Sequence, residues 1–127
     1  MDFETIFYEA NNGDADAQVI LGKLYYEGNV VEQDYIEAFE WFLKAAQQGD
    51  SYGWCWLGIM FYTGNGVNQD YDEALKCFAT SARMGNEDAR NALETLYVQK
   101  KSDGEDVPEW LTVGHGIFEI VKHLLGL

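Results

Sequence analysis

The cysteines and histidines that typically bind zinc are few and scattered in this sequence. Two cysteines, Cys55 and Cys77, and two histidines, His115 and His123, are all the cysteines and histidines in the chain. Four such side chains match the coordination number of zinc, but structural zinc sites take their ligands from closely spaced pairs, and these four lack that spacing. The sequence therefore predicts no metal site, and a zinc site built from these residues is a minor alternative.

Motifs for nucleophilic catalysis and for phosphate binding are also missing from the sequence. The serines Ser51, Ser81 and Ser102 lie in no strand-turn-helix elbow that would expose a catalytic hydroxyl. Neither a glycine-rich phosphate-binding loop nor a dinucleotide-binding fingerprint is present. Carboxylates are abundant, but an acidic chain brings many of them together by composition alone. We therefore expect no enzymatic activity and no cofactor.

The charge of the chain limits its partners. It has 22 acidic and 8 basic residues, which gives a net charge of −14. Such a chain repels polyanions, so we expect no binding to nucleic acid or to an anionic membrane, whereas a basic protein would be attracted. A charged surface also keeps an aromatic-rich chain dispersed, and this second explanation of the charge is compatible with the first.

The sequence favours a cytoplasmic protein. Its first residues, Met1-Asp2-Phe3-Glu4, lack the basic region and the apolar run of a secretory signal, and no stretch approaches the roughly 18–20 apolar residues of a membrane span. The two cysteines have no paired spacing, which suits a reducing compartment where thiols stay free.

The chain contains an internal repeat of 36 residues. Residues 14–49 align with residues 50–85 without a gap, and 15 of the 36 aligned positions are identical. Self-similarity at this period is the signature of stacked structural repeats. The same frame extends to a half repeat before residue 14, at residues 2–13, and to a half repeat after residue 85, at residues 86–100. Residues 1–100 are therefore predicted to form one repeat domain.

Each repeat unit has the start and stop signals of two helices. Glycines tolerate the left-handed backbone at a helix end, and the Asp or Asn that follows caps the next helix. Gly28 and Gly64 end the first helix, and Asp-x-x-Glu motifs resembling capping boxes begin the second. First helices are predicted over 15–27 and 51–63, and second helices over 34–48 and 70–84.

The apolar residues recur with the 3.6-residue period of a helix. Leu21, Leu24 and Tyr25 share one face of a first helix, and Ala38, Phe42 and Ala45 line a second helix. Small residues such as Gly22 and Gly58 let paired helices approach closely. One unit cannot bury its apolar face alone, so the units must stack into an all-α solenoid.

The pattern from Leu21 to Gly49, Leu-Gly-x-x-Tyr-x-x-Gly-x-x-Val-x-x-Asp-x-x-x-Ala-x-x-Trp-Phe-x-x-Ala-Ala-x-x-Gly, is similar to the Sel-one-like repeat, a relative of the tetratricopeptide repeats. The resemblance covers residues 3–100. It implies a right-handed α-solenoid of helix-turn-helix repeats, a role in assembling protein complexes and no catalytic residue. Some secreted members carry one disulfide in each repeat. Here the cysteines occur in a single copy, so we expect free thiols.

In related repeats the first helices line the inner, concave surface. Carried over to this sequence, that surface presents the following residues: Asp16, Val19, Lys23, Tyr26, Glu27, Tyr52, Cys55, Ile59, Tyr62, Thr63, Asp88, Asn91, Thr95, Val98 and Gln99. Tyrosines anchor many interfaces, and carboxylates would meet a basic partner. The predicted partner-binding residues are Asp16, Tyr26, Glu27, Tyr52, Tyr62 and Asp88. In the alternative interpretation, the tyrosines only pack on neighbouring helices.

The segment from 101 to 127 breaks the repeat pattern. Residues 101–106 are polar and are predicted to form a linker, and Pro108 suits the start of a new helix. From Ile117 to Leu124 the apolar spacing fits an amphipathic helix. The favoured interpretation is a C-terminal capping helix over the open end of the solenoid. The alternatives are a contact in a weak dimer, the protein otherwise being a monomer, or a strip that partly fills the concave groove.

The predicted function is protein binding, with two hypotheses. In the first, the chain is an immunity protein that neutralises a basic toxin such as a nuclease, because an acidic surface can cover a nucleic-acid-binding cleft. The resemblance agrees, since repeats of this family serve in some toxin systems, although a shared fold alone does not establish a function. In the second, the chain is an adaptor or scaffold for a signalling or secretion complex.

Overall fold

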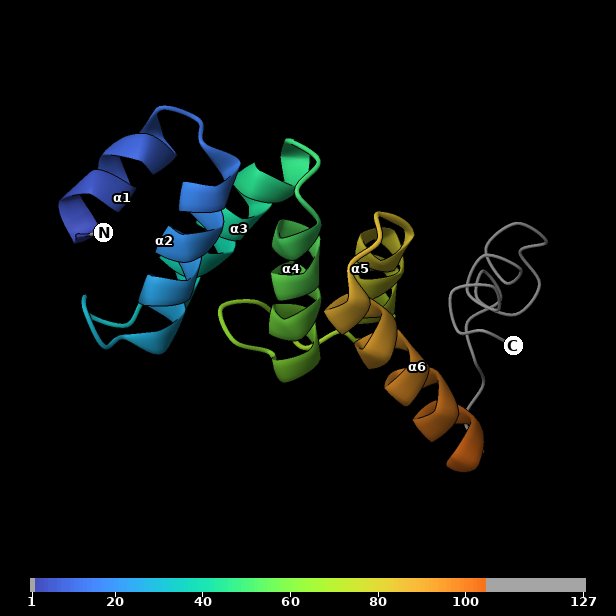
Figure 1. Ribbon diagram of the computed structural model, residues 1–127. Coiled ribbons are helices and arrows are strands. Elements are labelled where there is room, and N and C mark those ends of the chain that lie inside the picture. Colours follow the sequence, from blue (N-terminus) through green and yellow to red (C-terminus); the bar gives the residue numbers. More distant parts are fainter. Residues whose placement is uncertain (1, 105–127) are drawn as a thin grey trace.

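A computed structural model describes residues 2–104, and these form six α-helices and no strand (Figure 1). The helices are α1 (Phe3–Asn11), α2 (Ala15–Glu27), α3 (Tyr35–Gln47), α4 (Ser51–Thr63), α5 (Tyr71–Arg83) and α6 (Glu87–Ser102). The all-α prediction is confirmed, and α2 and α4 have the predicted bounds. Helices α3 and α5 begin and end one residue inside the predicted bounds, because the outermost residues serve as caps.

Acidic N-caps begin the second helix of each repeat. The Asp34 carboxylate accepts hydrogen bonds from the backbone N–H groups of Ile36 and Glu37, both at 3.1 Å. In each predicted capping box, only the hydrogen bond from a helix N–H to the Asp carboxylate forms. The N–H of Asp34 donates instead to the carbonyl of Tyr25 at 2.9 Å, and that of Asp70 donates to the carbonyl of Phe61 at 2.9 Å. This bond ties the start of each second helix to the end of the first.

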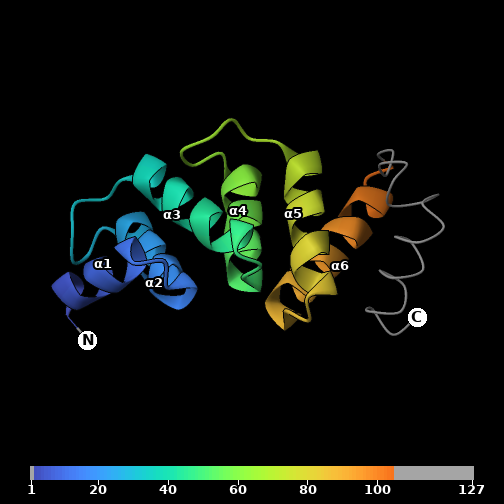
Figure 2. The same ribbon diagram turned by 90° about the horizontal axis from the view of Figure 1, so that it is seen from above.

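The helices stack in chain order from α1 at one end to α6 at the other (Figure 2). Each helix packs mainly on the helix before it and the helix after it. This is the contact pattern of a solenoid, in which every unit is stabilised by its neighbours.

The core runs through the stack as three clusters of buried side chains. The first lies among α1, α2 and α3 around Leu21, and the second contains Phe42 and Leu57. The third contains Phe78 and Leu93 and joins α4, α5 and α6. All five side chains are at most 3 % exposed. The apolar faces predicted from the 3.6-residue period are therefore the buried faces.

Helix α6 extends two residues into the segment that was predicted to be a linker. The helix continues to Ser102, so residues 101 and 102 are helical rather than part of a linker. Asp103 is the C-cap, and Gly104 follows with a positive φ of 72°. Residues 105 and 106 of the predicted linker and the predicted capping helix lie outside the described residues, and the division of the chain near residue 100 stays a prediction.

Candidate protein-binding surface

The first helices α2, α4 and α6 present equivalent positions one repeat apart, and these divide the predicted binding residues into two rows. The N-terminal row holds Asp16, Tyr52 and Asp88, which are spaced by one 36-residue period. The C-terminal row holds Tyr26, Glu27 and Tyr62. Asp16 and Tyr26 are ten residues apart on α2, which corresponds to about 15 Å along the helix axis. The predicted site is therefore two parallel rows rather than one compact patch.

The N-terminal row is open to solvent. Tyr52 is 55 % exposed, and the Asp16 and Asp88 side chains are also exposed. Neither carboxylate forms an ion pair with a described residue. Both lie in the first turn of their helix, where negative charge is stabilised by the helix dipole. The dipole alone accounts for aspartate at these positions, and it leaves the carboxylates accessible to a partner.

The two tyrosines of the C-terminal row differ in exposure. Tyr26 is half-buried between the rings of Tyr35 and Trp56, at centroid distances of 5.2 and 5.3 Å. Its hydroxyl accepts a hydrogen bond from the Asn65 side-chain amide at 3.2 Å. The packing interpretation therefore describes Tyr26 well. Tyr62 is more open, at 36 % exposure, and its ring contacts that of Tyr71 at 5.4 Å.

Two hollows flank Tyr62. The larger has a volume of about 360 Å³ and is lined by side chains of α4 and α6 and by Phe78 of α5. The smaller, of about 120 Å³, is lined by Tyr62, Tyr71 and Leu96, among others. Neither hollow was predicted from the sequence. The sequence held one indication of the larger hollow: Ala92 stands one period after Trp56 and has a much smaller side chain.

Two residues predicted on the inner surface are buried instead. Val19 is 9 % exposed and packs with residues of α3 and α4, and Cys55 is 6 % exposed and packs with residues of α5 and α6. These two positions are equivalent in the two repeats, and at this position the first helix faces the following helices rather than solvent. The other thirteen positions predicted for this surface are half-buried or exposed.

The two thiols are core groups. Cys55 and Cys77 are free and buried, and they belong to different core clusters. Burial raises the pKa of Cys55 to about 11 and that of Cys77 to about 12, so both are protonated at neutral pH. His115 and His123 lie outside the described residues. Within residues 2–104, no group of three or more His, Cys, Asp or Glu side chains is placed to hold a metal ion.

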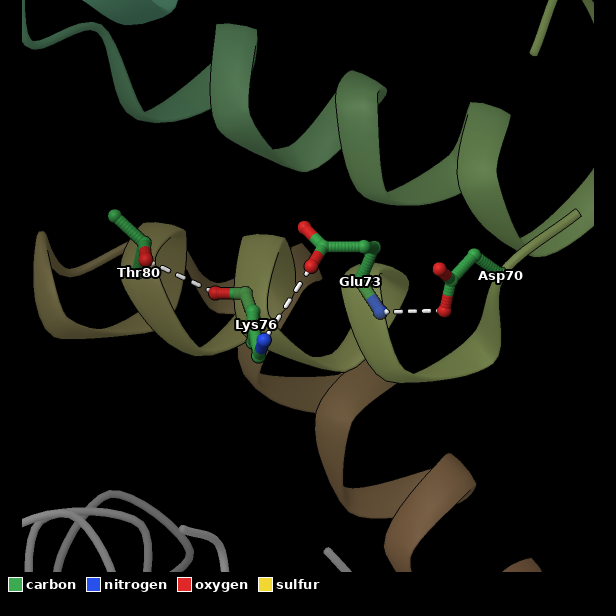
Figure 3. Close-up of polar contacts among 4 residues, drawn as sticks. All are labelled: Asp70, Glu73, Lys76 and Thr80. Atoms are coloured by element: carbon green, nitrogen blue, oxygen red, sulfur yellow. Dashed lines mark hydrogen bonds and ion pairs between the residues drawn. The ribbon is translucent and has the colours of Figure 1, made fainter. Parts of the chain in front are cut away.

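The polar side chains along α5 stabilise their own helix. The Asp70 carboxylate accepts the N–H of Glu73 at 3.1 Å, and the Lys76 ammonium pairs with the Glu73 carboxylate at 3.3 Å (Figure 3). The Thr80 hydroxyl donates to the carbonyl of Lys76 at 2.9 Å. These contacts span three or four residues, the spacing of neighbours on a helix, so they carry no sign of a binding site. The exposed face formed by α2, α4 and α6, which carries the two rows of predicted binding residues, is here called the first-helix face. Its carboxylates Asp16, Glu27 and Asp88 have no such partners among the described residues.

The fold and this face define a class: an α-solenoid of helix-pair repeats that serves as a protein–protein interaction module. The family model described as Sel1 repeat matches residues 15–50 and 55–86. The chain belongs to the Sel1 repeat family. Among curated protein sequences, none matches the chain significantly.

Solved structures agree with this assignment. The chain is similar to c5321, a protective antigen of uropathogenic Escherichia coli with an SLR fold, at 30 % identity and a TM-score of 0.77 over 97 % of this chain and 26 % of that one. A Sel1 repeat protein from Oxalobacter formigenes shares 25 % identity, with a TM-score of 0.69 over 89 % of this chain and 45 % of that one. Helicobacter pylori cysteine rich protein B shares 28 % identity, with a TM-score of 0.66 over 73 % of each chain. The chain therefore spans less than half the length of the first two.

Between residues 2 and 104, no helix combines the length and the apolar character needed to cross a bilayer.

Proposed function

We propose that the chain is a cytoplasmic immunity protein, which binds a basic toxin such as a nuclease through the first-helix face and blocks it. The observation that carries this proposal is the chemistry of that face. Asp16, Glu27 and Asp88 are exposed on α2 and α6 and form no ion pair with a described residue, and Tyr52 and Tyr62 are exposed on α4. Unpaired carboxylates attract a basic protein, and exposed tyrosines supply short-range contact energy.

The carboxylates and the tyrosines of this surface contribute to the proposed complex in different ways. The carboxylates act at long range and speed the encounter with a basic partner, as the net charge of −14 also does. The tyrosines act at contact and hold the complex together, because exposed charge pairs contribute little once they are screened. A nuclease is a suitable target, since its substrate-binding cleft is basic and an acidic rigid surface can fill it. No catalytic role is proposed for any residue.

A second candidate function is an adaptor that assembles a signalling or secretion complex. The repeat geometry favours it, because equivalent positions recur at a fixed spacing along α2, α4 and α6 and can follow an extended segment of a partner. The adaptor and the immunity protein differ in what happens to the partner after binding, and not in the surface used.

The two functions are separated by isolating the partner and testing its toxicity. The tagged chain is used to copurify a native partner, with Tyr62→Ala and Asp88→Lys as test variants. Tyr8→Ala, on α1 and 70 % exposed, and Glu40→Lys, on the exposed side of α3, are the matched controls. The proposal expects a basic partner that both test variants lose and both controls retain.

The isolated partner is then expressed alone and together with the chain. An immunity protein restores growth to cells that the partner alone kills, and its Asp88→Lys variant restores less. A harmless partner that still needs the first-helix face supports the adaptor. A partner retained equally by all four variants contradicts both proposals.

A further inference from the structure

The contact between the first two repeats contains an aromatic stack that the next contact lacks. Trp56 of α4 lies parallel to Phe42 of α3, with ring centroids 5.2 Å apart and an interplanar angle of 7°. The same indole packs on Tyr26 of α2 at 5.3 Å. One repeat later, Phe78 and Tyr62 occupy the positions of Phe42 and Tyr26, but Ala92 occupies the position of Trp56.

The space left by this change is the larger of the two hollows beside Tyr62. It has a volume of about 360 Å³, and Phe78, Tyr62, Ala92, Ile59 and Leu96 are among its lining residues. Its lining is mainly apolar at the base, and the volume is at the lower end of the ~300–1,000 Å³ typical of ligand pockets. We name it the Ala92 pocket. Phe78 and Tyr62 line the pocket, and their equivalents one repeat earlier, Phe42 and Tyr26, pack against an indole. Tyr62 is 36 % exposed, whereas Phe78 is only 3 % exposed.

We propose that the Ala92 pocket receives one aromatic side chain, an indole or a phenyl ring, from the basic partner of the first-helix face. The proposal rests on the proposed function and names the group on the partner that is recognised. A planar ring entering the pocket would pack beside Tyr62, as Trp56 packs beside Tyr26, and against the apolar side chains of Ile59, Ala92 and Leu96. Aromatic side chains that fill such pockets are the common anchors of protein interfaces.

The rim of the pocket indicates the residues that flank this ring on the partner. Asp88 is exposed one turn before Ala92 on α6, without an ion pair to a described residue. Asp88 does not line the pocket itself, whereas Asn91 and Gln99 of α6 border it and are exposed. A lysine or arginine next to the aromatic residue would meet the Asp88 carboxylate, and the amides offer hydrogen bonds to its backbone. The fitting motif is therefore an aromatic residue between basic ones.

Binding to the pocket is measured on the full chain by two-dimensional amide NMR with the blocked tripeptide Lys-Trp-Lys as the probe. The expected result is a saturable shift of amides around Phe78, Ala92 and Leu96, with no comparable shift for Lys-Ala-Lys. Ala92→Trp should fill the pocket with the chain's own indole and weaken the probe at least about tenfold, the loss expected for an interface anchor. Ala92→Ser keeps the pocket open and should bind as wild type does.

Three results would overturn the proposal. Equal shifts with Lys-Ala-Lys would mean that charge alone is recognised. The absence of shifts in the wild type and in Trp110→Ala would mean that the pocket takes no ring. Shifts seen only in Trp110→Ala would mean that the chain's own Trp110, six residues beyond Gly104 in the sequence, is the occupant. A thermal melt of Ala92→Trp checks that this variant folds.

The same variants distinguish failure of this inference from failure of the proposed function. A copurified partner that is lost by Asp88→Lys but retained by Ala92→Trp overturns the pocket as a partner site and leaves the proposed function standing. A partner that is indifferent to every first-helix variant overturns the proposed function, and with it the assignment of the ring to that partner, even where the tripeptide binds.

Discussion

Gly58 and Phe78 are so close that any side chain in place of the glycine would have to displace the ring: a Cβ on Gly58 would lie 2.7 Å from the Phe78 ring. Gly22 has the same relation to Phe42 one repeat earlier, at 2.5 Å. In both repeats, therefore, a glycine in the first helix sets how closely the second helix packs against it.

Gly58→Ala tests this contact. We expect the free energy of unfolding to fall by about 1–3 kcal/mol, because a methyl group forced into a packed core displaces its neighbours. The sign is informative, since alanine has a higher helix propensity than glycine by about 1 kcal/mol and would stabilise an open site. Urea unfolding measures the change, with Asn91→Ala on exposed α6 as the control. A Gly58→Ala variant as stable as the wild type contradicts the packing described here.

Leu57→Ala tests the core itself. Leu57 is 2 % exposed and packs in the central cluster, so its truncation should leave a cavity and cost about 2–5 kcal/mol. Ile36→Ala is the control, because Ile36 is 65 % exposed and its truncation should change stability by less than about 0.5 kcal/mol. Similar losses for both variants in a thermal or urea melt would show that the helix faces are misassigned.

Asp70→Ala tests the N-cap of α5. The Asp70 carboxylate accepts the N–H of Glu73, and its loss should lower stability by about 1 kcal/mol. Asp70→Asn retains a side-chain oxygen and should lose much less. Urea melts that rank both variants equally would mean that the cap does not contribute.

The buried thiols give a prediction about pH. With the pKa of Cys55 raised to about 11, only about one such thiol in a thousand is ionised at pH 8, so iodoacetamide should leave the folded chain unmodified and label two thiols after denaturation. Because both thiol pKa values are raised above 9.0 in the folded state, their contribution to stability is complete below pH 9 and is lost as the pH rises toward 11–12. Replacing both cysteines by alanine should remove that part of the alkaline loss. Rapid labelling of the native chain would contradict the burial.

The sequence predicted the helices better than the surface. Capping residues and glycines mark helix ends locally, so the bounds of α2 and α4 follow directly from the repeat. The exposure of a side chain on the first-helix face depends on what the neighbouring repeat places opposite it. Tyr26 is enclosed because Trp56 covers it, and Tyr62 stays open because Ala92 does not.

The burial of two residues on the first-helix face could not be predicted from the sequence for the same reason. Val19 and Cys55 were expected at the surface because the family pattern places their position on the inner side, but the packing of the following helices covers them. Helical periodicity gives the direction of a side chain and does not give the depth of the groove around it.

The central claim, an acidic and tyrosine-bearing surface that binds a basic partner, is tested most directly by the association rate of the copurified partner as salt is raised. The Debye length falls from about 10 Å at 0.1 M to about 3 Å at 1 M, so the rate for the wild type should fall steeply. Glu27→Lys and Asp88→Lys should slow association and flatten its salt dependence. Tyr52→Ala and Tyr62→Ala should mainly speed dissociation. A partner with an acidic isoelectric point, or a rate that ignores salt and survives all four substitutions, would contradict the account.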